Sequence, residues 1–126
     1  MENKSDKNIE LTYWEKFVLN HQKRGNLILH FISLAIFYSG IILAIINYDP
    51  IYLLMSVFCG IPGALGHIIY KEHWEGPQEM FNIGLVWYIT LIFYKVIIGK
   101  YKQETEMAYK KLSLLNQEKQ KNKERD

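Results

Sequence analysis

The chain carries four histidines, and imidazole is the side chain best suited to bind a transition metal near neutral pH. His21 precedes a long apolar segment and His30 lies near its start, whereas His67 ends a second apolar segment and His73 follows it. A short polar turn joins the two segments, so antiparallel helices would bring His30 and His67 to one end of a hairpin. We therefore expect these four histidines to form a metal or haem site at one membrane face.

The turn between His21 and His30 matters for this site. If residues 13–30 formed one helix, these two histidines would face opposite sides, because nine residues at about 100° each is roughly 900°. A helix that ends at Gly25, with Asn26 capping the next, removes that objection. Small residues lie on the same stripes as the histidines and would let the two long helices approach closely: Ser33, Gly40 and Ala44 on the first, Gly60 and Gly63 on the second.

The elements that must position the histidines are those of an all-α membrane protein. The 126 residues are 49% hydrophobic, and the apolar ones concentrate between two charged ends. We expect a polar, disordered N-terminus over residues 1–10, a membrane domain over 11–99 and a charged, partly helical tail over 100–126. Within the membrane domain, the pattern predicts an amphipathic interfacial helix with a Thr12–Glu15 capping box. A transmembrane hairpin and a third apolar helix follow it, at residues 26–46, 51–70 and 83–99.

Charge predicts the orientation of the hairpin in the membrane. The N-terminal flank holds five Lys and Arg residues, whereas the turn at 47–50 holds none, so the N-terminus and the histidines should face the cytoplasm. The host would be a bacterial inner membrane or the endoplasmic reticulum. Three full crossings would place the Lys-rich tail on the far side, so either the third segment does not cross fully or the tail is translocated. The net charge of +2 favours contact with lipid headgroups and gives no reason to expect a nucleic-acid partner.

The motif His21-x4-Asn26-x3-His30-Phe31-Ile32, followed by an apolar hairpin and Gly66-His67, resembles the 2-hydroxy fatty acid dioxygenase family. Its members are small membrane proteins that were long classed as a domain of unknown function, and the characterised one acts in phytosphingosine breakdown. The resemblance runs from about residue 14 to residue 80. It implies an Fe²⁺-dependent dioxygenase of lipid α-oxidation that uses dioxygen to shorten 2-hydroxy fatty acids by one carbon.

The resemblance also implies the roles of individual residues. His21, His30, His67 and His73 would be the metal ligands. The family usually carries Glu four residues after the Gly-His histidine, where this chain has Lys71, so the last ligand could be His73, Glu72 or Glu75. The residues expected to support the ligands or to bind the substrate carboxylate are Asn26, Lys71, Glu72 and Glu75, with Arg24 as another candidate for the carboxylate.

Two other functions fit the same pattern. His30 and His67 on antiparallel helices could be the axial ligands of a haem. Alternatively, the chain could be a structural or interaction protein in which the histidines are incidental, since a single interfacial histidine is more often solvated than a ligand. Four histidines at one end of the hairpin, with none elsewhere, favour a metal site.

Overall fold

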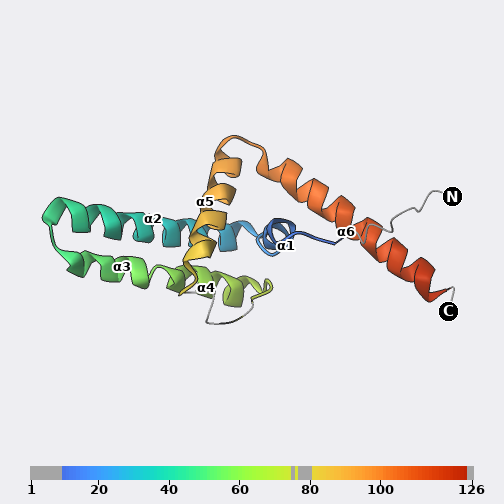
Figure 1. The fold of residues 1–126 in the computed structure, drawn as a ribbon, viewed down its shortest axis with the longest axis horizontal. Helices are drawn as coiled ribbons and strands as arrows, with labels where there is room; N and C mark the ends of the chain where they lie inside the picture. The colour runs from blue at the N-terminus through green and yellow to red at the C-terminus, as the bar shows by residue number, and fades with distance from the viewer. Residues whose placement is uncertain (1–9, 75, 77–80, 125–126) are drawn as a thin grey trace, which may run out of the picture.

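The computed structural model describes residues 10–74, 76 and 81–124, and it contains helices and no strand within them. Figure 1 shows a long hairpin, a helix that crosses it near one end, and a last helix that extends away from it. The elements are α1 (Tyr13–Leu19), α2 (Arg24–Asn47), η1 (Pro50–Tyr52), α3 (Leu53–Val57), α4 (Gly60–Tyr70), α5 (Ile83–Ile97) and α6 (Tyr101–Lys123). The all-helical prediction is confirmed, while the expected disorder at 1–10 falls almost wholly outside the described residues.

The hairpin turns where the sequence predicts it, directly after α2. Tyr48 takes the left-handed conformation, with φ 50°. Asp49 then accepts a hydrogen bond from the backbone N–H of Ile51, at 2.9 Å. Pro50 is the first residue of η1, a position where a backbone N–H has no acceptor within the helix, so proline loses no hydrogen bond there. The chain therefore reverses within a few residues, and α3 and α4 run back along α2 (Figure 1).

Two segments are long and apolar enough to cross a membrane: α2, and the returning arm from Pro50 to Tyr70. Both arms expose large apolar side chains on their outer faces, from Ile45 and Ile46 at the turn to Ile68 and Ile69 at the other end. Contiguous apolar surface of this extent is typical of a face that contacts lipid. The prediction of a membrane-spanning hairpin is thus supported by both length and surface.

The returning arm is broken, as its Gly and Pro residues predict. α3 ends at Val57 and α4 begins at Gly60. Pro62 has no N–H to donate to the carbonyl of Phe58 one turn earlier, and Ile61 donates to that carbonyl instead, at 3.2 Å. The break therefore falls one turn before Pro62, where the proline ring would clash with a continuous helix.

The break before α2 does not lie at Gly25, so that prediction is wrong. α1 has its predicted Thr12–Glu15 capping box but ends at Leu19, and α2 begins at Arg24 with Lys23 as its N-cap. Gly25 lies inside α2, where a β-carbon would come within 1.9 Å of the Tyr70 ring. The glycine thus serves close contact between α2 and the end of α4 rather than helix termination.

The third apolar segment does not run alongside the hairpin. α5 crosses it near the end that holds α1 (Figure 1), and its 15 residues correspond to about 23 Å, less than the roughly 30 Å of a bilayer core. It reaches the length of a span only together with α6, from which it is bent by 115°. The tail is helical as far as Lys123, and Ala108 within it is buried.

Polar side chains fasten α6 to α1 and α5. Glu104 accepts hydrogen bonds from the Trp14 indole, at 3.1 Å, and from Lys95, at 2.5 Å. Lys111 pairs with Glu15 at 2.8 Å. Partial burial acts to raise the pKa of Glu15, but hydrogen bonds from Lys111 and the capping box outweigh it and hold that pKa below its usual value. The first half of the tail therefore lies against α1, on the histidine side of the hairpin.

The close approach at Gly40 gives a first prediction. A β-carbon there would lie 2.5 Å from the Ser56 hydroxyl oxygen and 2.9 Å from backbone atoms of the returning arm. We expect Gly40→Ala to lower the free energy of unfolding in detergent by about 1–3 kcal/mol, because backbone has to move. Ser39→Ala, on the exposed face of the same turn, is the control. Equal stability of the two variants would contradict this packing.

The contact between α6 and α1 gives a second prediction. The contact with Lys111 of α6 lowers the pKa of Glu15 below its usual value of 4.5. The Glu15–Lys111 ion pair therefore stabilises the packing of α6 on α1 above pH 4.5, and this stabilisation is lost as the pH falls through the lowered pKa of Glu15. Lys111→Gln should raise hydrogen exchange near residue 108 by up to about fivefold at pH 7, the limit for a partly exposed ion pair of about 1 kcal/mol. Lys110→Gln, on an exposed position, should not. An unchanged rate in Lys111→Gln would refute the role of this pair.

Candidate metal centre

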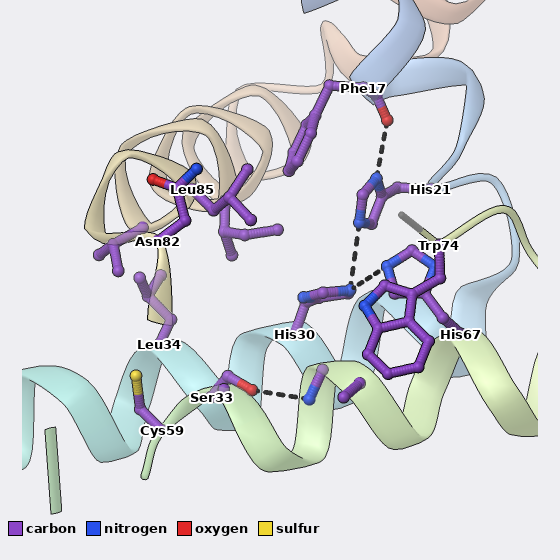
Figure 2. A pocket seen from close by; sticks show the side chains of 15 residues that line it. Phe17, His21, His30, Ser33, Leu34, Cys59, His67, Trp74, Asn82 and Leu85 are labelled. Atoms are coloured by element: carbon purple, nitrogen blue, oxygen red, sulfur yellow. Dashed lines mark hydrogen bonds between the residues drawn. The ribbon is translucent and has the colours of Figure 1, made fainter. Parts of the chain in front are cut away.

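Three histidines from three parts of the chain converge on one point (Figure 2). The Nε2 atom of His30 lies 3.1 Å from Nε2 of His21 and 3.0 Å from Nε2 of His67. All three ligand atoms lie within 4.8 Å of one another. Two imidazoles bound to one ion at about 2.1 Å, at 90–110° to each other, have nitrogens about 3.0–3.4 Å apart. The two contacts of His30 therefore have the length expected between neighbouring ligands of one transition-metal ion.

His21 is held in the tautomer that a metal requires. It lies in the turn after α1, is 3% exposed, and its Nδ1 lies 2.7 Å from the carbonyl oxygen of Phe17. A carbonyl can only accept, so Nδ1 carries the hydrogen and Nε2 presents its lone pair to the other two rings. Burial lowers the pKa of His21 to about 4. The ring is therefore neutral at pH 7 and able to bind a cation.

The hydrogens of three neutral imidazoles cannot satisfy these contacts. Nε2 of His21 has no hydrogen, so His30 would have to donate to it. A single N–H on His30 then leaves the 3.0 Å contact with His67 without a hydrogen of its own, and an N–H on His67 would meet the one on His30. A cation among the three lone pairs removes this conflict. The arrangement thus fits a metal ion better than a hydrogen-bonded cluster.

The two long helices approach closely at the histidines because one of them presents glycines. A β-carbon on Gly63 would come within 2.7 Å of the His30 ring, and one on Gly66 within 2.2 Å of the Asn26 amide oxygen. The backbone N–H of Gly63 donates to the Ser33 hydroxyl, at 2.9 Å. The predicted small residues of α4 therefore allow the His30 ring to lie directly against this helix.

Glu72 fastens the turn that carries His21. One carboxylate oxygen accepts hydrogen bonds from the backbone N–H groups of Gln22, at 2.7 Å, and Lys23, at 3.0 Å. The other accepts from the fully buried Asn26 side chain, at 2.6 Å. These N–H groups stand at the start of α2, where a negative charge is favoured. Glu72 thus acts as a clamp between the end of α4 and the turn before α2, and Asn26 is its partner rather than a helix cap.

The other predicted site residues lie outside the three-histidine group. His73 is exposed, as are Lys71 and Arg24. Lys71 takes a left-handed conformation, with φ 53°, and ends α4. Glu72 is near the histidines but is committed to the clamp, and Glu75 falls outside the described residues. Among the residues that the structure describes, no carboxylate joins the group as a fourth ligand.

Two cavities border the histidines on different sides. The inner one, of about 70 Å³, is mostly apolar and runs between α2, α4 and α5 (Figure 2). The outer one, of about 110 Å³, is lined by Tyr13, Lys16, Phe17, Asn20, His21, His67 and His73. Lys16 is one of these lining residues, and it was not predicted from the sequence as part of the site. His73 therefore lines the outer cavity beside His21 and His67.

Several contacts with the cluster have no signal in the sequence. Phe17, one turn before His21, supplies the carbonyl that fixes its tautomer, and only the four-residue spacing hints at this. The Tyr101 hydroxyl donates to the backbone carbonyl of His21 from α6, 80 residues away. Val86 and Ile89 of α5 form a wall of the inner cavity. The positions of Tyr101, Val86 and Ile89 depend on how α5 and α6 pack on the rest of the chain, and local sequence patterns do not predict that packing.

Comparisons with known proteins do not identify the chain. No family model matches it, and no curated protein or solved structure is similar enough to count as a relative.

The clamp gives a third prediction. Glu72→Ala should weaken metal binding by roughly tenfold or more, since residues that orient metal ligands typically contribute this much. The loss of the clamp frees the turn that carries His21, while the contacts of His30 and His67 with each other remain. The measurement is the dissociation constant of the purified protein for Fe²⁺ or Co²⁺. Lys71→Ala, at the exposed neighbouring position, is the control, and equal affinities for the two variants would show that Glu72 does not position the site.

Proposed function

We propose that this chain is a membrane-embedded nonhaem iron dioxygenase that shortens 2-hydroxy fatty acids by one carbon. The observation that carries the proposal is the convergence of three imidazole nitrogens at the end of an apolar cavity between helices suited to cross a membrane. The likeness of the His21, Asn26, His30 and Gly66-His67 pattern to the dioxygenase family supplies the reaction. A ferrous ion bound by three imidazoles would keep positions open for substrate and dioxygen.

The distance between His30 and His67 argues against the haem alternative. Two axial ligands lie on opposite sides of the iron, so their nitrogens are about 4 Å apart when each bond is about 2 Å. Here they are 3.0 Å apart, and His21 lies 3.1 Å from one of them. A separation of 3.0 Å is that of neighbouring rather than opposite ligands, so it favours a small ion over a haem.

The surrounding residues fit the proposed substrate. In the overall reaction, a 2-hydroxy acid and O₂ give an acid one carbon shorter, CO₂ and water, which balances atoms and electrons without another reductant. The polar head would lie at the histidines, and the alkyl chain would stay among the apolar helices. Lys16 lines the outer cavity beside His21 and His67 and would attract a carboxylate. The Phe17 carbonyl holds His21 oriented, with its Nε2 atom toward the other histidines.

We infer that the site faces the cytoplasm of a bacterial inner membrane or of the endoplasmic reticulum. The histidine end of the hairpin holds Lys23, Arg24 and Lys71, whereas the turn at 47–50 has no positive charge. α6 lies against α1, so both would be on that same side. α5 is then an apolar helix along the membrane face rather than a third span. This arrangement removes the need to translocate the Lys-rich tail.

The test is iron binding followed by turnover. After anaerobic reconstitution with Fe²⁺, the purified protein should hold about one iron per chain without a Soret band. His21→Ala, His30→Ala and His67→Ala should each lower iron content by at least about tenfold, because each removes one of three ligands. His73→Ala is the matched control and should retain iron. The loaded protein should convert 2-hydroxyhexadecanoic acid to pentadecanoic acid in the presence of O₂.

Each outcome has a distinct meaning for the proposal. No iron after reconstitution, in protein whose helical content is intact by circular dichroism, would leave a structural or interaction protein as the better account. A Soret band would support the haem alternative. Iron that binds but gives no shortened acid would keep the metal site and refute the dioxygenase function. Loss of iron in His73→Ala would make that histidine a fourth ligand.

A further inference from the structure

The inner cavity is elongated along the two helices of the hairpin. It follows successive turns of two helices, from His30 to Leu34 on α2 and from His67 to Gly60 on α4. Seven residues of helix correspond to about 10 Å, so the cavity extends from the histidines toward the middle of the hairpin. Its volume of about 70 Å³ is several times the roughly 10–15 Å³ that one water molecule requires. It is thus a narrow apolar space parallel to the hairpin.

The walls of this space come from different elements. Gly60, Gly63 and Ala64 form one side, and their small size leaves the space open. Leu85, Val86 and Ile89 of α5 form the opposite side, because α5 packs against α2 across it (Figure 2). Cys59 lies at the far end from the histidines and is 8% exposed. No ionisable side chain other than the histidines and Cys59 is among the lining residues, so a charged or strongly hydrated ligand part would not be favoured there.

We propose that the inner cavity binds the first carbons of a single unbranched hydrocarbon chain whose polar head is at the histidines. The chain would lie parallel to the hairpin, as lipid chains do in the bilayer. This inference rests on the proposed function for the nature of the head group, and it adds that Ala64 and Val86 set the width of the chain site. A short 2-hydroxy acid that lacks the chain would occupy the histidines and leave the cavity empty.

The cysteine at the far end provides a direct test, because it is the single cysteine of the chain. The rate of its modification by methyl methanethiosulfonate is measured by mass spectrometry on iron-loaded, anaerobic protein in detergent. Saturating 2-hydroxydodecanoic acid should slow modification of Cys59 at least fivefold, whereas lactate, which has the same head and no chain, should not. Equal rates with and without the long acid would overturn the proposal.

Filling variants test the width of the site. Ala64→Phe should abolish protection by the long acid, whereas Leu65→Phe, the next residue on the lipid-exposed face, should keep it. Val86→Phe fills the cavity from the opposite wall and replaces Ala64→Phe in this test if that variant does not fold. Its control is Trp87→Phe, at an exposed position. Protection that survives in a folded filling variant would overturn the proposal.

The same samples separate this inference from the proposed function. Iron content and conversion of the 2-hydroxy acid in air are measured beside the protection. Protection without iron or product would support the chain site and refute the dioxygenase. Iron and product without protection would support the dioxygenase and overturn the chain site.

Discussion

The close packing of α4 on α2 is the constraint on which the rest of the structure depends. Gly63 and Gly66 leave no room for a β-carbon, so the His30 ring and the Asn26 side chain lie directly against the α4 backbone. In a membrane, where lipid is as apolar as the helices themselves, such close contact and interhelical hydrogen bonds replace the hydrophobic effect as the source of association. The bond from Gly63 to Ser33 belongs to this contact. The close packing of α4 on α2 is what makes His30 and His67 neighbours.

The third histidine depends on a different kind of interaction. His21 comes from a turn rather than a helix, and charge-assisted hydrogen bonds to Glu72 hold that turn to the end of α4. The Phe17 carbonyl then selects the tautomer, and Tyr101 of α6 holds the backbone of His21 from outside. A polar clamp can serve here because this end of the hairpin borders water, where the desolvation cost of a carboxylate is smaller than at the membrane centre.

The location of the cluster explains why a membrane protein would carry it. The histidines border the outer cavity, which Lys16 and Asn20 also line, and the apolar inner cavity, so the proposed substrate could present its head to them while its chain lies among apolar side chains. α5 makes the second condition possible, since it covers the cavity from the side opposite α4. The proposed enzyme, which would act near the head of a single-chain lipid, would require this combination of apolar and polar surroundings.

The sequence by itself determined the helices, the hairpin and a cluster of histidines at one end, because apolar length and a short turn are local properties. It also predicted that small residues such as Gly63 let the two long helices approach closely. Only the tertiary structure decided that the first break lies before Lys23 rather than at Gly25, since Glu72 and Tyr70 are distant in sequence. The same holds for the exclusion of His73 from the group and for the position of α5, which depend on packing between elements rather than on periodicity within one.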